Sequence, residues 1–439
     1  MSAILISRDD PGDPADHVRP AAAMQPACGQ PRRWLSQVCQ RRLLERLSCI
    51  NDGRLYLDDG CHRTVVGDAA DDGLEATVMV RNERFYRRLV SRGSLGAAES
   101  YLDGDWDADD LVSLFRLFGR HLNCFRPNRS LVELPAGLAA RGRHWLSRNS
   151  KNGSRRNIRA HYDLGNAFFE LFLDPTMMYS SAMFESPGMT LEQAQVSRLN
   201  HICRQLDLRP EHHVIEIGTG WGGFALHAAQ TVGCRVTTTT ISPQQYEYAR
   251  NRVQQAGLND RVTVLLKDYR DLTRADSAAE TRVGQFDRLV SLEMIEAVGR
   301  EYYPRYFRIC EQLLKPNSQM LLQAIVMPEQ RYSRYLRSVD FIQKYIFPGG
   351  CLPSVTALQT AATGNTSMRL VRLDDFADGY AQTTREWRSR FHKRLADVRR
   401  QGFDERFLRT WDYYLAYCEA AFRERTVGVV QAVWERQLR

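Results

Sequence analysis

The spacing of hydrophobic residues divides the second half of the chain into alternating strands and helices. Short apolar runs predict five strands, at His213–Ile217, Arg235–Thr240, Val262–Leu266, Phe286–Ser291 and Gln319–Ile325. Helical spacing predicts helices between them, at Gly223–Thr231, Pro243–Ala256 and Tyr303–Leu314. This alternation favours an α/β fold with a parallel, doubly wound sheet. The aromatic and arginine-rich segment Phe376–Arg439 is expected to add helices at the end of this domain.

The first part of the chain has a different pattern. Residues 1–30 are rich in Asp, Pro and Ala without periodicity, which is typical of a disordered tail. Residues 31–125 are expected to form a smaller α+β domain. Its helices are predicted at Trp34–Leu47, Arg84–Val90 and Asp109–His121, and its strands at Arg54–Leu57 and Leu74–Val80. Residues 126–157 are interpreted as a linker, so the second domain covers 158–439.

A glycine-rich turn joins the first strand of the second domain to its helix. In the run from Val214 to Gly223, an apolar stretch ends in Gly218, Gly220 and Gly222. Strand, glycine turn and helix open a nucleotide-binding βαβ unit. A helix N-terminus also offers unpaired N–H groups to an electron-rich ligand. The pattern is also compatible with an ordinary strand–helix turn, but it favours the nucleotide-binding unit.

The next strand ends indicate which nucleotide the turn suits. A dinucleotide fold has an acidic residue roughly 20 residues after the first glycine. Here the second strand ends in Val236–Ser242 without an acid, whereas Asp268 follows the third strand. This arrangement favours an adenosyl group over NAD.

Composition narrows the class of partner. Of the 439 residues, 43% are hydrophobic and 26% are charged, which is ordinary for a soluble protein, and no signal or membrane-spanning pattern is seen. A cytoplasmic protein is therefore expected. The net charge of +8 suits an anionic partner, either nucleic acid or a phospholipid surface, and no nucleic-acid motif is found. The ten cysteines form no CxxC pair, so neither a metal site nor a disulfide framework is indicated.

Six motifs flank the glycine turn in a fixed order. They are His161–Asn166, Leu173–Pro175 and Tyr179–Ala182 before it, and Lys267–Leu272, Glu293–Gly299 and Tyr345–Ser354 after it. From about residue 84 onward the chain resembles the cyclopropane-fatty-acyl-phospholipid synthase family of S-adenosylmethionine-dependent methyltransferases. The resemblance implies a Rossmann-like class I methyltransferase domain with a mostly parallel seven-stranded sheet. It also implies a homodimer that works at the inner face of an anionic membrane.

The resemblance further implies the reaction. The methyl group of S-adenosylmethionine is added to the cis double bond of an unsaturated phospholipid acyl chain. An alkene is a poor nucleophile, so the electrophile must be held in line with it. The resulting carbocation must be kept from water until a base removes a proton and a cyclopropane ring closes. In this family the implied base is a bound bicarbonate, held by polar groups in an apolar pocket.

The resemblance assigns site residues by position. The cofactor-binding residues are Tyr162, Tyr179, Ser180, Gly218, Thr219, Gly220, Thr240, Gln245, Asp268, Tyr269 and Arg270. The residues expected around bicarbonate are Glu296, Tyr380, Cys418 and the backbone of Ile325. Outside the resemblance, Cys418 and Tyr380 are also compatible with core packing, and Glu296 with a helix-start carboxylate.

The chain departs from the common bacterial pattern at several of these positions. Ser181 stands where a cysteine is expected, Gln323 where a histidine is expected, and Glu293 where a small residue is expected. Serine and glutamine can still hydrogen-bond an anion. Glu293 and Glu296, three residues apart on a predicted helix, would share a face, and a dry pocket would raise at least one pKa. Glu293 would then relay the proton or reduce the need for bicarbonate, unless it pairs with an arginine.

The run from Glu293 to Gly299 also bears on the product. It resembles a subgroup that includes plant cyclopropane synthases and bacterial enzymes that make a methylene branch. The ring is favoured, and the alternatives are the methylene product or a degenerate paralogue that only binds lipid. A methyltransferase for a soluble small molecule and a basic nucleic-acid-binding protein are the other classes considered.

Overall fold

The computed structural model describes residues 34–123, 164–273 and 285–438, and the statements below refer to these ranges. The predicted tail, the predicted linker and Tyr162 lie outside them. Within the described ranges, no helix has the length and apolar character needed to span a bilayer.

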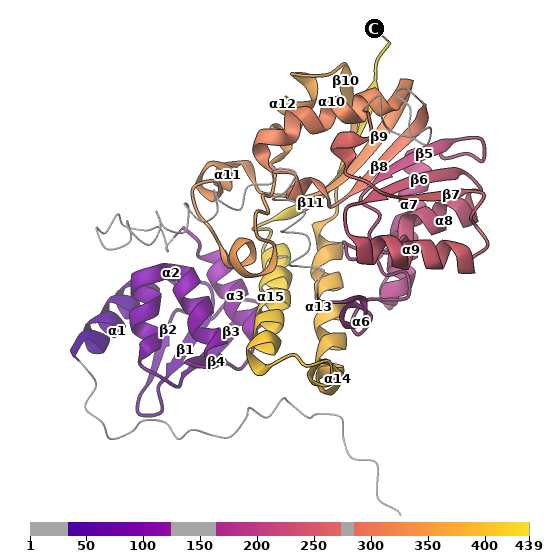
Figure 1. Ribbon diagram of the computed structural model, residues 1–439. Coiled ribbons are helices and arrows are strands. Elements are labelled where there is room, and N and C mark those ends of the chain that lie inside the picture. The colour runs from indigo at the N-terminus through magenta and orange to yellow at the C-terminus, as the bar shows by residue number, and fades with distance from the viewer. Residues whose placement is uncertain (1–33, 124–163, 274–284, 439) are drawn as a thin grey trace, which may run out of the picture.

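A seven-stranded sheet forms the centre of the larger part of the molecule (Figure 1). Its strands are β5 (His213–Ile217), β6 (Arg235–Thr240), β7 (Val262–Leu266), β8 (Phe286–Leu292), β9 (Leu314–Val326), β10 (Met368–Asp375) and β11 (Gly428–Arg436). The order is β10-β11-β9-β8-β5-β6-β7. Among these strands, β11 runs in the opposite direction to the other six. The predicted α/β fold with a mostly parallel seven-stranded sheet is confirmed.

Helices cover both faces of this sheet. One face packs on α7 (Leu191–Gln205), α8 (Gly223–Thr231) and α9 (Pro243–Gln255). The other packs on α10 (Tyr303–Leu313) and α12 (Val355–Thr363). Each face is an apolar core, which is why the central strands read as nearly continuous hydrophobic runs.

The expectation that Phe376–Arg439 is entirely helical is wrong, because residues Gly428–Arg436 form β11. This stretch is rich in valine, and its side chains alternate between the two cores. Val430 and Trp434 face the α10 side, whereas Val433 faces the α8 side. That period of two belongs to a strand. The edge strand β10, in which most positions are exposed, was not predicted either.

Residues 34–123 form a smaller unit with its own sheet, ordered β2-β1-β3-β4. Its elements are α1 (Trp34–Leu47), β1 (Arg54–Asp58), β2 (Arg63–Val66), β3 (Glu75–Val80), α2 (Arg84–Leu102), β4 (Trp106–Ala108) and α3 (Leu111–Arg120). The helix predicted at Arg84–Val90 continues to Leu102, with a break at Gly93, where φ is 57°.

The C-terminal helices connect the two units. They are α13 (Ala377–Lys393), α14 (Leu395–Arg400) and α15 (Glu405–Arg423), and α15 packs against α2 and α3 (Figure 1). Arg409 on α15 donates to the carbonyl oxygens of Tyr101, at 2.7 Å, and Trp106, at 2.9 Å. Its guanidinium also lies 3.9 Å from the centre of the Tyr101 ring. Polar and cation–π contacts therefore join the small unit to the larger part of the molecule.

We expect Trp411→Ala to lower the free energy of unfolding by about 3–5 kcal/mol, because it removes a large buried side chain. Trp411 is 2% exposed and packs against Phe168, Phe172 and Phe407. Chemical denaturation measures the change. The matched control is Trp34→Ala, at a side chain that is 72% exposed, which should change stability by less than about 0.5 kcal/mol. Equal losses in the two variants would contradict this packing.

Candidate active site

A cavity of about 2300 Å³ lies over the carboxyl ends of the central strands and reaches α15 and the N-terminal unit. All the predicted cofactor-binding residues that the structure describes line it. They are Tyr179, Ser180, Gly218, Thr219, Gly220, Thr240, Gln245, Asp268, Tyr269 and Arg270. Parallel α/β sheets place their ligands at this edge.

The glycine turn between β5 and α8 leaves room for a ligand. Gly218 and Gly220 have φ angles of 105° and 52°, which residues with a Cβ atom rarely adopt. The N–H groups of Gly218 and Thr219 donate to Thr239 O at 3.0 and 3.1 Å, which fixes the turn against β6. A Cβ on Gly220 would meet no atom within 4 Å. Ser180 Oγ, also on the cavity wall, is buried without a hydrogen-bond partner among the described residues. This open cradle and the unsatisfied hydroxyl fit a polar ligand such as the adenosyl-methionine group.

Two polar pairs shape the wall beyond the turn. Thr240 Oγ1 donates to Gln245 Oε1 at 2.9 Å. The Asp268 carboxylate accepts from the backbone N, Nε and Nη2 of Arg270 at 3.0, 2.9 and 2.7 Å. Asp268 is therefore already paired, and it holds the segment that carries Tyr269 in place.

A second group of residues holds the carboxylate of Glu293. Its Oε1 accepts from the backbone N of Ser181 at 3.0 Å and from Gln323 Nε2 at 2.6 Å. Its Oε2 accepts from the hydroxyl of Tyr380 at 2.6 Å. The three donors come from the loop before α7, from β9 and from α13. Ser181 contributes its backbone rather than its hydroxyl, which donates to Ala182 O instead.

The expectation that Glu293 and Glu296 share a face of one helix is wrong. Glu293 follows β8 with a left-handed φ of 51°, and Glu296 lies in the short 3-10 helix η2 (Ile295–Ala297). Glycine adopts the left-handed conformation at little cost, whereas another residue there stores roughly 1–3 kcal/mol of strain. Both carboxylates nevertheless line the same cavity.

Gln323 is oriented by two residues that the sequence did not indicate. Its Oε1 accepts from Gln431 Nε2 at 3.0 Å and from the buried Arg198 Nη1 at 3.3 Å, so its amide NH₂ points at Glu293. Arg198 sits within the ordinary amphipathic pattern of α7, which gives no signal. Gln431 is a polar residue within an otherwise apolar stretch. Once this segment is known to be a strand, a polar residue at a buried position indicates a buried hydrogen bond.

The carboxylate of Glu296 accepts fewer hydrogen bonds than that of Glu293. Its Oε1 accepts from Ile325 N at 2.7 Å, but its buried Oε2 has no partner among the described residues. Burial, followed by the charge of Glu293, raises the pKa of Glu296 to about 8. Burial also raises the pKa of Glu293, and hydrogen bonds from Tyr380, Ser181 and Gln323 oppose that rise.

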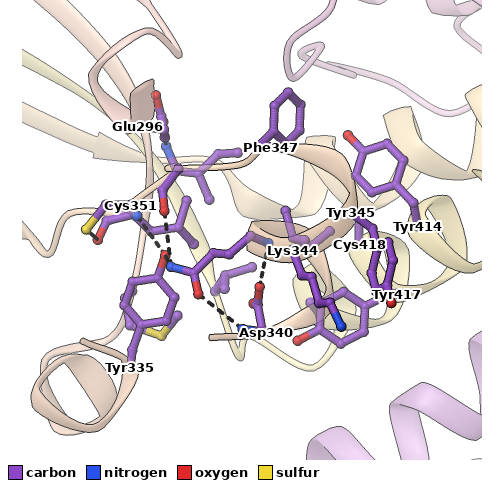
Figure 2. Close-up of a pocket in the computed structure, with 18 of the residues that line it drawn as sticks. Glu296, Tyr335, Asp340, Lys344, Tyr345, Phe347, Cys351, Tyr414, Tyr417 and Cys418 are labelled. Carbon is purple, nitrogen blue, oxygen red and sulfur yellow. Dashed lines mark hydrogen bonds between the residues drawn. The ribbon is translucent and has the colours of Figure 1, made fainter. Parts of the chain in front are cut away.

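Tyr380 and Cys418 reach the cavity from α13 and α15. At Gly379 the helix α13 comes so close to Ala182 O that a Cβ would collide, and this approach sets Tyr380 against Glu293. Figure 2 shows Tyr414, Tyr417 and Cys418 together on α15, with Tyr335 and Cys351 beyond the segment that carries Lys344 and Phe347. Burial raises the pKa of the Cys418 thiol, so it stays protonated near neutral pH.

The fold and cavity define a class I S-adenosylmethionine-dependent methyltransferase, and comparisons with known proteins specify it further. The profile of the mycolic acid cyclopropane synthetase family matches residues 149–432. The chain is 38% identical over 419 residues to the tuberculostearic acid methyltransferase of Mycobacterium tuberculosis, covering 94% of each protein. It is 36% identical over 395 residues to the cyclopropane-fatty-acyl-phospholipid synthase of Escherichia coli K12, covering 89% of this chain and 97% of that enzyme.

Solved structures agree with these relatives. A cyclopropane synthase from Mycobacterium tuberculosis superposes with a TM-score of 0.58 at 26% identity, over 64% of this chain and 98% of that one. A mycolic acid cyclopropane synthase complexed with SAH and CTAB gives the same TM-score at 28% identity, with the same coverage. The chain belongs to the mycolic acid cyclopropane synthetase family of methyltransferases, as the sequence motifs predicted.

We expect Glu296→Gln to change how stability depends on pH. Because the pKa of Glu296 rises from 4.5 to about 8 on folding, the folded wild type binds an extra proton in this window and loses stability as the pH rises through it. The glutamine variant lacks that loss, so its stability relative to wild type should increase between about pH 5 and 8, by at most about 1.4 kcal/mol per pH unit. Chemical denaturation across this range measures it, and parallel profiles for the two proteins would contradict the burial of Glu296.

Proposed function

We propose that this enzyme transfers a methyl group from S-adenosylmethionine to the cis double bond of an unsaturated phospholipid acyl chain. The observation that carries the proposal is a carboxylate cluster in the same cavity as the glycine turn. Relatives at 38% and 36% identity are named for reactions on fatty acids and phospholipids.

The cavity residues supply binding and protection from water. S-adenosylmethionine, when bound, provides an electrophilic methyl group. The glycine turn, Ser180 and the Thr240–Gln245 pair would hold its polar parts. Tyr179, Phe347 and Tyr414 form a connected aromatic wall. Such a wall excludes water, and its ring faces stabilise a cation on the lipid.

A cyclopropane ring is the proposed product, formed when a base in the carboxylate cluster removes a proton from the added methyl group. The second candidate is a methylene branch formed after a hydride shift. The similarity to a relative named as a tuberculostearic acid methyltransferase favours this candidate, because that name specifies methyl transfer without ring formation. Both products need a buried base near the methyl group.

Incubation of the enzyme with S-adenosylmethionine and vesicles of cis-monounsaturated phospholipid tests the proposed function. We expect mass spectrometry to show a gain of one CH₂ per modified acyl chain. Proton NMR then distinguishes cyclopropane signals from vinylidene signals. Saturated phospholipid is the control and should not react. Absence of any mass gain with unsaturated lipid would refute the function.

We also propose that the enzyme acts on the anionic inner face of the membrane, as a homodimer. The support for a membrane surface is a net charge of +8 and the exposed start of α1, where Trp34 and Leu35 precede Arg41 and Arg42. Exposed aromatic and aliphatic side chains beside arginines are typical of interfacial helices. Light scattering after size-exclusion chromatography tests the dimer.

We expect the double substitution Trp34→Ala, Leu35→Ala to weaken binding to anionic vesicles at least about tenfold, since two apolar side chains no longer enter the lipid. The matched control is Val371→Ala, Leu373→Ala on β10, where both side chains are also exposed. Vesicle co-sedimentation at several salt concentrations measures binding, which should weaken as salt rises. Equal binding to neutral vesicles at every salt concentration would count against an anionic surface.

A further inference from the structure

The residues expected to bind bicarbonate do not fit a separate anion in this structure. Ser181 N, Gln323 Nε2 and Tyr380 OH all donate to Glu293. Ile325 N donates to Glu296. A further anion beside two carboxylates would be repelled and would find these four donors already used. No step of the reaction is therefore assigned to bicarbonate.

Glu293 lies between two of its three donors and the cavity. Glu293 and Tyr380 line the cavity wall, whereas Ser181 and Gln323 do not and lie behind the carboxylate. The left-handed φ of Glu293 is a strain that persists only where the surroundings hold it. Three hydrogen bonds from three separate segments supply that restraint. The chain thus presents its own carboxylate at the position built for an anion.

We propose that the Glu293 carboxylate replaces bicarbonate as the base of this reaction, an inference that rests on the proposed function. As the bond between sulfur and the methyl group breaks, the π electron pair of the lipid double bond forms a bond to the methyl carbon and leaves a cation on the other alkene carbon. A Glu293 oxygen takes a proton from the new methyl group. The electron pair of that C–H bond closes the ring, or forms a methylene after a hydride shift. The positive charge of the sulfonium ends as the proton on Glu293, which passes to solvent after product release.

The hydrogen bonds distinguish Glu293 from Glu296 as the base. Glu293 accepts three hydrogen bonds, which favour its ionised form, and the charge of the buried Arg198 acts in the same direction. Glu296 accepts one, and its other oxygen has no partner among the described residues. If the two neighbouring carboxylates hold one proton between them, this unequal hydrogen bonding places it on Glu296.

The bicarbonate dependence of turnover tests the proposal in three proteins. Wild-type turnover should be the same in bicarbonate-free buffer and after bicarbonate is added. Glu293→Gly suits the left-handed backbone and vacates the anion position. Its turnover should fall by about 100-fold or more without bicarbonate and recover at least about tenfold when it is added. Glu293→Gln keeps an amide in the site, so its turnover should fall equally and not recover. Bicarbonate-dependent turnover of the wild type, or full turnover of Glu293→Gln, would overturn the proposal.

A binding measurement separates this inference from the proposed function. Carbon-13 NMR of labelled bicarbonate should show no line broadening with wild type and clear broadening with Glu293→Gly. Bicarbonate binding to the wild type would overturn the proposal that the Glu293 carboxylate occupies the anion position. Equal binding of S-adenosylhomocysteine by calorimetry shows that each variant is folded. Glu247→Gln, at an exposed carboxylate on α9, is the matched control and should keep wild-type turnover. If the wild type forms no product at any bicarbonate concentration, the proposed function fails, while the NMR titration still tests the anion position.

Discussion

The burial of the Glu293 carboxylate is the constraint on which the active-site architecture depends. A buried charge that loses its partners costs several kcal/mol, so the donors to Glu293 must all be in place when the fold closes. The sheet provides part of this alignment, because the β8–β9 register pairs Leu292 with Gln323 and the β11–β9 register pairs Gln431 with Gln323. A slip in either register would remove the amide that faces Glu293. The fold and the site are thus specified by the same strand pairings.

The surroundings of this carboxylate suit a reaction that forms a cation in an apolar chain. The aromatic rings of Tyr179, Phe347 and Tyr414 line the cavity, and interactions between charges are strong where such rings keep water out. The glycine turn and the carboxylates line the same cavity, so one cavity can hold both reactants. A base supplied by the chain needs no diffusible ion to enter that space.

The sequence predicted the central strands and the turn well, because buried parallel strands and glycine turns leave strong local patterns. His213–Ile217, Arg235–Thr240 and Val262–Leu266 were predicted with the bounds that the structure has. Strand β11 was missed because it follows a long helical segment and completes its pairing only with distant β9 and β10. The roles of Arg198 and Gln431 could not be predicted, since they depend on which side chains meet across the sheet. Glu293 was noticed as a departure from the family pattern, but its left-handed backbone and its three donors are tertiary features.

Helix α15 serves both halves of the molecule. One side carries Tyr414 and Cys418 into the cavity, and another carries Arg409 to the backbone of the N-terminal unit. A shift of this helix relative to the N-terminal unit would therefore move the cavity wall as well. The two units are not interchangeable parts, and exchanging the N-terminal unit between family members would require the matching face of α15 to be exchanged with it.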